Sequence, residues 1–444
     1  MVENKTPEVC VVGGGIAGLS AAVFLANEGV NVTLIEASPK FGGRAYSFFD
    51  KELNEFVDNG QHILASWYKN TFEFLDLIGS NENIKTQDTL QVTFADKQGK
   101  KYNFKCPKLP PPLHLVWGIF GYDAIGFKDK VGIVKLVSSI KRNKFTNDEL
   151  KAFTVTELFH LTEQSEKLID NFWKPFVIAI FNAEPDETNA WYFAEMIKLG
   201  FLSKGNSKLV LPLKGLNELY VEKSIEFLEK KNACIKTGIR VKGLKIINNS
   251  VEALITENND ELKFDYYISA VPFFEFKNLI GDELYRDEYN YLENLKPSPI
   301  VNVHLKYFTD NHEDILKHDF IGILNSTIQW VFKVNKDRIC IVISSANEIA
   351  GMNKENLVKL CIEELKQCIP EFRNVTFTYS KVVKEMRATF LPDISSLNSR
   401  PANKTKYNNF FIAGDWTDTG YPATIEGAVL SARKCADEVL KVIK

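Results

Sequence analysis

The chain has 444 residues, of which 45% are hydrophobic and 25% charged, a composition typical of a folded protein rather than a disordered or collagen-like one. The 54 Lys and Arg residues nearly balance the 57 Asp and Glu residues, so we expect no nucleic acid partner. The seven cysteines are scattered without a C-x-x-C pair, which argues against a disulfide framework and a zinc cluster, and we expect no metal site.

The polar residues 1–7 lead directly into an expected strand, so we predict no secretory signal and a cytoplasmic location. No uncharged apolar stretch reaches the roughly 20 residues that a membrane-spanning helix needs. Any membrane contact would therefore be peripheral, on the inner face of the cytoplasmic membrane.

A β-α-β unit is expected at the start of the chain. Residues 9–12 form a short β-branched run that ends in three glycines, which is typical of a buried parallel strand entering a tight turn. The next residues, rich in Ala and Leu up to residue 26, favour a helix that ends before Gly29. Residues 30–35 then alternate as a second strand.

The turn of this unit has the spacing of a dinucleotide-binding loop. Gly13 permits the sharp turn, Gly15 lets the backbone approach a pyrophosphate, and Gly18 allows close packing of helix on strand. Glu36, at the end of the second strand, would accept hydrogen bonds from ribose hydroxyls. The alternative is a plain glycine turn followed by a surface glutamate.

A Gly42-Gly43-Arg44 sequence follows within ten residues and indicates a second contact with an anionic dinucleotide. Near residue 90 the chain is expected to cross into another domain, and a proline cluster at residues 107–112 marks a connection. The later expected elements are a loop at 205–215, a helix at 216–230, and strands at 234–235, 240–247, 251–256, 266–272, 300–307, 339–344 and 410–413.

The segment 113–145 is a candidate membrane contact. Residues 113–120 are apolar apart from one histidine, and residues 127–146 carry six basic residues against one acid. In a helix, Lys128, Lys135 and Arg142 share one face, whereas the face with Ile133 and Ile140 is apolar. This pattern predicts an interfacial helix on anionic lipid, with a solvated basic helix packed on the protein as the alternative.

Three segments together resemble motifs of the amine oxidase and carotenoid desaturase superfamily of flavoproteins. They are Gly42-Gly43-Arg44 and two C-terminal segments, residues 411–416 and 424–428. The resemblance implies that Gly42, Gly43 and Arg44 lie along the FAD pyrophosphate and flavin. It also implies that Asp415 holds the ribityl chain, and that the helix starting near Thr424 directs its positive end at the flavin.

Four further segments more specifically resemble the hydroxysqualene dehydroxylases: residues 58–62, 110–118, 384–390 and 420–429. This resemblance extends over nearly the whole chain. It implies hydride transfer from reduced FAD to hydroxysqualene, with loss of water to give squalene. A long-chain isoprenoid substrate and a reductant for the flavin are then required. Phytoene-type desaturases share the outline and are the alternative enzyme class, and a non-catalytic flavin-bearing subunit is a third possibility.

Three residues are candidates for catalysis. His62 follows the Gly60 turn beside the expected flavin, where an imidazole can supply a proton or make a structural hydrogen bond. Asp58 is either a turn carboxylate or a proton donor. Arg387 lies where related desaturases place an arginine near the flavin, with an interdomain salt bridge as its alternative. His304, set among apolar residues, is expected to be a core histidine.

We therefore predict an α/β fold, with a Rossmann-like FAD-binding domain built from residues 1–90, 207–275 and 385–444. An inserted α+β substrate domain comprises residues 91–206 and 276–384. FAD is expected to bind non-covalently, and the sequence does not indicate the oligomeric state. The predicted cofactor contacts are Gly13, Gly14, Gly15, Gly18, Glu36, Gly42, Gly43, Arg44, Gly60, Gln61, Val241, Gly414, Asp415, Thr424 and Ile425.

Overall fold

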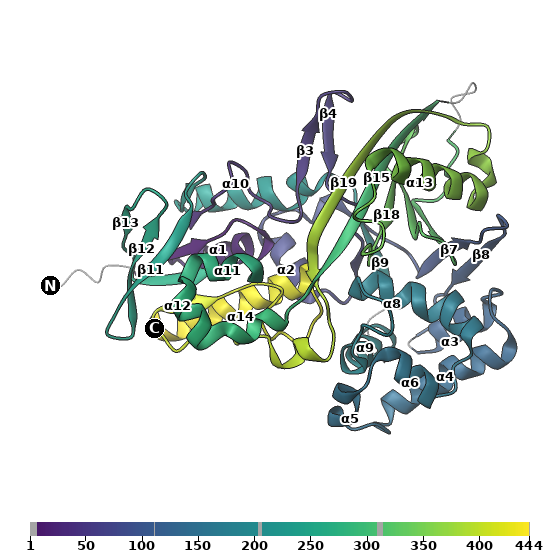
Figure 1. Ribbon diagram of the computed structural model, residues 1–444, viewed down its shortest axis with the longest axis horizontal. Helices are drawn as coiled ribbons and strands as arrows, with labels where there is room; N and C mark the ends of the chain where they lie inside the picture. The colour runs from purple at the N-terminus through teal and green to yellow at the C-terminus, as the bar shows by residue number, and fades with distance from the viewer. Residues whose placement is uncertain (1–6, 111, 203–206, 309–313, 444) are drawn as a thin grey trace.

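A computed structural model describes residues 7–110, 112–202, 207–308 and 314–443. Pro111 of the proline cluster and the start of the loop at 205–215 lie outside this range. Figure 1 shows two halves: the first and last parts of the chain lie together around a parallel sheet, whereas a long mixed sheet and a group of helices form the other half.

The parallel sheet has five strands in the order β10-β2-β1-β14-β20, and every neighbouring pair is parallel. Helix α1 (Ile16–Asn27) packs against it and against α14 (Ile425–Ile443), and its residues from Ile16 to Ala26 are all buried. A helix enclosed in this way must be apolar on all sides, which its sequence satisfies. The strands are β1 (Glu8–Val12), β2 (Asn31–Ile35), β10 (Cys234–Lys236), β14 (Tyr266–Ser269) and β20 (Phe410–Ile412).

The larger sheet has the order β19-β15-β18-β17-β16-β7-β8 and is antiparallel except between β16 and β7. One face packs against α13 (Lys354–Cys368), and Val301, Val303 and Leu357 belong to the shared hydrophobic core. The strands are β7 (Gln91–Ala95), β8 (Lys101–Lys105), β15 (Pro297–Phe308), β16 (Phe320–Ile323), β17 (Trp330–Lys333), β18 (Arg338–Ile343) and β19 (Thr376–Phe390).

Helices between residues 113 and 202 cover one end of this sheet (Figure 1), around a core in which Trp173 stacks on Phe159 and meets Phe193 edge-on. They are α3 (Leu113–Gly121), α4 (Phe127–Lys141), α5 (Asn147–Ala152), α6 (Val155–Leu161), α7 (Glu166–Leu168), η2 (Ile169–Trp173), α8 (Lys174–Phe181), α9 (Ala190–Ile197) and η3 (Lys198–Leu202).

The remaining elements connect the halves or cover their edges. The strands are β3 (Ser47–Asp50), β4 (Glu55–Asp58), β5 (Leu64–Ala65), β6 (Ile84–Thr86), β9 (Leu209–Pro212), β11 (Val241–Ile247), β12 (Ser250–Thr256) and β13 (Glu261–Leu262). The helices are α2 (Lys69–Leu77), η1 (Asn81–Asn83), η4 (Asn217–Glu222), α10 (Lys223–Lys230), α11 (Phe273–Ile280), α12 (Asp282–Leu284), η5 (Tyr285–Tyr289), η6 (Asn290–Asn294), η7 (Pro370–Phe372) and η8 (Ser395–Asn398).

The predicted α/β class is confirmed, with a parallel sheet built from separated chain segments. The expected helix at 216–230 is present as η4 followed by α10. The strand expected at 266–272 ends at Ser269, because Pro272 already caps α11. The domain boundaries stay a prediction.

Helix α4 has the two faces that the sequence predicts. Ile133 and Ile140 are buried in the helical core, whereas Lys128, Lys135 and Arg142 are exposed. Of the two interpretations, the structure has α4 packed on the protein through its apolar face. Within the described ranges, no helix combines the length and apolarity that crossing a bilayer requires.

Candidate active site

The loop between β1 and α1 is shaped by steric exclusion. Gly13 has φ +109°, and a methyl group there would lie 2.9 Å from the carbonyl oxygen of Ala270. A methyl group at Gly18 would lie 1.8 Å from the carbonyl oxygen of Gly13, so the helix can approach the strand only with glycine at this position. At Gly15, in contrast, the nearest neighbour would be 3.8 Å away, and this residue borders the cavity described below.

Glu36 holds the loop from the end of β2. Its carboxylate accepts hydrogen bonds from the backbone N–H groups of Gly14 at 2.6 Å and Ser38 at 2.7 Å, one on each oxygen. Each carboxylate oxygen accepts more than one hydrogen bond, so capacity remains for ribose hydroxyls. Glu36 borders the same cavity, as its predicted role requires.

The Gly42-Gly43 turn lies directly on the first loop. The N–H of Gly42 donates to the carbonyl oxygen of Gly14 at 2.8 Å, and a methyl group at Gly43 would lie 2.9 Å from the Cα of Gly15. Both residues have positive φ, +112° and +60°. Two glycine segments thus present exposed backbone side by side, which suits a diphosphate.

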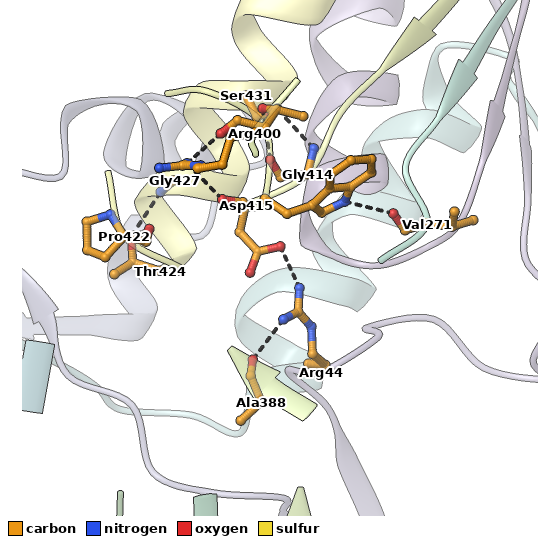
Figure 2. A network of polar contacts seen from close by, with 12 residues as sticks. Arg44, Val271, Ala388, Arg400, Gly414, Asp415, Pro422, Thr424, Gly427 and Ser431 are labelled. Atoms are coloured by element: carbon orange, nitrogen blue, oxygen red, sulfur yellow. Dashed lines mark hydrogen bonds and ion pairs between the residues drawn. The ribbon is translucent and has the colours of Figure 1, made fainter. Parts of the chain in front are cut away.

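Arg44 and Asp415 form an ion pair that joins the two ends of the chain (Figure 2). The guanidinium donates to Oδ1 of Asp415 at 2.6 Å and to the carbonyl oxygen of Ala388 at 2.8 Å. Burial on its own lowers the pKa of Arg44, but the charge and hydrogen bond of Asp415 outweigh it and raise the pKa. Arg44 is therefore a fixed positive charge at the cavity wall.

Arg400, which was not predicted from the sequence, positions Asp415 through its backbone. Its buried guanidinium donates to the carbonyl oxygens of Asp415 and Thr417 and to the hydroxyl of Thr419 (Figure 2). No motif surrounds this arginine in the sequence. Gly414 donates its N–H to Oγ of Ser431 at 2.9 Å, which anchors the same segment on α14.

The N-terminus of α14 borders the cavity. Thr424 caps it by accepting a hydrogen bond from the N–H of Gly427 at 3.0 Å, and Thr424 and Ile425 both line the cavity. The positive end of a 19-residue helix therefore faces this space. Glu426 points elsewhere, where it accepts hydrogen bonds from Asn70 and Thr71 at the start of α2.

One cavity of about 1110 Å³ runs from these loops into the second half of the molecule. The predicted residues Gly60, Gln61, His62, Val241 and Gly414 line it together with the residues above. Its extension is mainly apolar and is lined by residues from β7, β8, α3, η2, α8, α9, β17 and β18, among them Phe94, Phe104, Leu115, Phe172, Phe176, Ile180, Met196, Trp330, Phe332 and Val342.

The three predicted catalytic residues have different surroundings. His62 lines the cavity, and burial lowers its pKa to about 4, so the imidazole is uncharged at neutral pH. Asp58 is outside the cavity lining, and its carboxylate accepts hydrogen bonds from Ser47 and from the N–H of Leu216. Burial raises the pKa of Asp58, and its contacts hold the β3–β4 hairpin rather than face the cavity.

Arg387 lines the cavity from a partly exposed position. Its side chain is 49% exposed, with its guanidinium 3.8 Å from the ring centre of Phe274 and 3.9 Å from Glu275 of α11. Asn302, a buried amide on β15 that lines the cavity, was also not predicted from the sequence.

The residues present fit a bound dinucleotide. Glycine backbone, a fixed arginine, a carboxylate placed to bind a ribose, and a helix N-terminus share one cavity.

Comparison with known proteins agrees with this geometry. The sequence pattern of the family described as flavin containing amine oxidoreductase matches residues 16–440. The chain is 28% identical over 442 residues to a hydroxysqualene dehydroxylase of Zymomonas mobilis, covering 97% of this chain and 98% of that protein. It is 23% identical to the chloroplastic/chromoplastic 15-cis-phytoene desaturase of an Oncidium hybrid, covering 99% of this chain and 78% of that protein.

Among solved structures, an oxidoreductase from Methanosarcina mazei superimposes with a TM-score of 0.73 over 97% of this chain and all of that one, at 16% identity. At this identity the likeness concerns the fold alone. It supports the arrangement of the parallel sheet and the mixed sheet around one cavity.

Proposed function

The chain belongs to the flavin-containing amine oxidoreductase family, and from that premise we propose that it reduces hydroxysqualene to squalene. It is an FAD-dependent oxidoreductase. The observation that carries the specific reaction is the match, over nearly the full length of both chains, to hydroxysqualene dehydroxylases. The phytoene desaturases match over a smaller part of their own length.

The apolar extension of the cavity supports a long isoprenoid as substrate. Its aromatic and aliphatic side chains are uncharged. A hydrocarbon chain that moves from water into such surroundings lowers the free energy of the system, which favours binding. Ring faces such as those of Phe332 and Trp330 can also stabilise a developing allylic cation.

When bound in its reduced form, FAD would supply the hydride that replaces the hydroxyl group at the allylic carbon. The hydroxyl takes up one proton from a bound water molecule and leaves as water, and an external reductant must then restore the cofactor. Arg44 and the N-terminus of α14 hold the anionic cofactor. His62, uncharged at neutral pH, donates a ring N–H hydrogen bond toward the leaving oxygen. The apolar walls exclude water from the site.

Anaerobic incubation of the reduced holoenzyme with hydroxysqualene tests this function. We expect the flavin to become oxidised while squalene forms in equal amount. Oxidation of phytoene by the oxidised holoenzyme, without reaction of hydroxysqualene, would instead identify a desaturase. If neither substrate changes the flavin, the chain is a flavin-bearing subunit without turnover.

We further propose that the protein reaches its substrate at the inner face of the cytoplasmic membrane. Trp117 of α3 is 66% exposed and Phe127 of α4 is 72% exposed, with Leu113 and Phe120 also exposed beside them. We call these four residues, three aromatic and one leucine, the aromatic patch. Phe120 and Phe127 are in ring contact, at 5.7 Å between centroids. On the same helix as Trp117, buried Leu115 lines the cavity, so the patch lies near its apolar extension.

Basic residues accompany the aromatic patch. Lys128, Lys130 and Lys135 follow on α4, and such side chains attract anionic lipid headgroups with roughly 1 kcal/mol each. Trp117→Ser combined with Phe127→Ser should weaken binding to anionic vesicles at least tenfold without changing flavin content. Equal binding of the double variant and the wild type would refute the patch as the contact.

A further inference from the structure

Strand β15 contributes Ile300 and Asn302 to the cavity wall, and Asn302 is the polar one of the two. The odd-numbered residues of the strand, Val301, Val303 and Leu305, pack in the core under α13. Asn302, between them, is 4% exposed and lines the cavity. Its direct neighbours across the sheet are Val342 on β18 and Val383 on β19, so the strands beside it offer no side-chain hydrogen bond.

The amide oxygen of Asn302 has no hydrogen-bond partner among the described residues. A buried acceptor without a partner is unfavourable, and a water, an ion or a bound ligand can supply the missing hydrogen bond. Asn182, another buried asparagine of the same cavity wall, is a useful contrast. It donates to Ser298 and Thr389 and accepts from the N–H of Ser345, so its amide serves the fold.

The position of the Asn302 amide connects it with the predicted flavin-facing segment. A methyl group at Gly60 would lie 2.8 Å from Nδ2 and 2.9 Å from Oδ1 of Asn302, so a larger residue at position 60 would displace this amide. His62 follows two residues later and lines the same cavity. On the other side, β17 and β18 contribute Trp330 and Val342 of the apolar extension.

We propose that Asn302 binds the hydroxyl group of the substrate and thereby selects an allylic alcohol over a hydrocarbon. This inference rests on the proposed function and deepens it. The amide oxygen accepts the hydrogen bond of the substrate O–H, which leaves the lone pairs of the hydroxyl oxygen free to take up a proton as the C–O bond breaks. The product carries no hydroxyl, so the amide loses its partner and product binding is weakened relative to substrate.

Equilibrium binding to the oxidised holoenzyme tests the proposal, because the oxidised flavin cannot reduce the substrate. Titration with hydroxysqualene and with squalene is followed by flavin absorbance. We expect the wild type to bind the alcohol at least tenfold more tightly than the hydrocarbon. Asn302→Leu, which is similar in volume but has no hydrogen-bonding group, should bind both within about twofold to threefold.

Val342→Ala is the matched control, because it alters the adjacent strand of the same wall without removing a polar group. It should keep the preference for the alcohol. Asn302→Val, which suits a strand, replaces the leucine variant if that protein does not fold. Asn302→Ser retains an acceptor and should restore part of the preference.

Two results would overturn the inference. One is an apolar variant that keeps the wild-type preference for the alcohol. The other is a variant that keeps this preference but shifts the flavin spectrum or its reduction potential, which would assign the amide to the cofactor. Failure of the wild-type enzyme to convert hydroxysqualene would instead refute the proposed function, so the two failures are distinguishable.

Discussion

The two halves of the cavity are built in opposite ways. In the half that we assign to the cofactor, glycine backbone forms part of the wall beside a few polar side chains, and larger residues are excluded at Gly13 and Gly43 by contacts under 3 Å. In the substrate half, the wall consists of large side chains that come from elements between residues 91 and 343. The first half is therefore specified by sterics at single positions and the second by the combined volume of many side chains.

This contrast predicts that variants separate into two groups. Changes in the cofactor half should lower flavin content and all activity with it. Changes in the substrate half should leave flavin bound and alter substrate binding or turnover.

Gly18→Ala should abolish FAD binding, because the added methyl group would lie 1.8 Å from the carbonyl oxygen of Gly13 and must displace the loop or the helix. Flavin content of the purified protein is the measurement. Gly351→Ala is the matched control, since nothing lies within 4 Å of a methyl group there. Normal flavin content in Gly18→Ala would contradict the steric account.

Asp415→Asn should weaken FAD retention by about 10-fold to 100-fold, because it leaves the Arg44 charge without its partner at a partly buried site. Flavin remaining after dilution and gel filtration measures the effect. Lys245→Gln, which removes an exposed ion pair with Glu252 and Glu261, should change nothing. Equal retention in both variants would mean that the Arg44–Asp415 pair does not hold the cofactor.

Ala179→Trp should raise the KM for substrate at least tenfold while flavin content stays normal. Ala179 lines the cavity from α8, and the indole would occupy space that the isoprenoid needs. Ala152→Trp, at an exposed position on α5, is the control. Loss of flavin in Ala179→Trp would contradict the prediction that changes in the substrate half leave flavin bound.

His62→Gln should slow single-turnover flavin oxidation by hydroxysqualene less than about tenfold, because the glutamine amide can also donate a hydrogen bond. Since the pKa of His62 is about 4, the wild-type rate should not titrate with this group between pH 6 and pH 8. A rate that rises tenfold per unit as pH falls through this range, and loses that dependence in His62→Gln, would show that the imidazolium is the acid.

His304→Gln should reduce the acid sensitivity of folding. Burial, with a contribution from Arg338, lowers the pKa of His304 to about 4, below the 6.5 of an exposed histidine. The unfolded chain binds the proton first as pH falls, so stability is lost from about pH 6.5 down to pH 4. Between pH 7 and pH 5 this loss is about 2 kcal/mol.

Thermal unfolding of the holoenzyme at pH 7 and pH 5 measures this difference. The fall in Tm should be smaller in His304→Gln than in the wild type. His160→Gln, at an exposed position on α6, is the control and should behave as the wild type does. An identical fall in all three proteins would exclude His304 as a source of acid sensitivity.

The local structure around the proposed cofactor site could be predicted from the sequence, whereas the individual cofactor contacts stay predictions. The β-α-β unit, the Gly42-Gly43-Arg44 turn and the helix near Thr424 lie where their motifs predict, and their residues border one cavity. Such motifs are readable because each is a short contiguous stretch whose backbone must turn sharply or approach a ligand closely. Glycine at fixed spacing is the direct consequence of that requirement.

The substrate half needed the tertiary structure. Three features depend on neighbours distant in the chain: whether Asp58 faces the cavity or a backbone N–H, how far Arg387 is exposed, and whether the apolar face of α4 packs on the protein. No short sequence pattern marks Arg400 or Asn302 as part of the site. The sequence by itself determined the cofactor class and the β-α-β unit with its glycine turns, since local sterics decide these turns. Only the packing of the two sheets and the helices between them decided which side chains line the apolar extension of the cavity, because that lining depends on many contacts between residues distant in the chain.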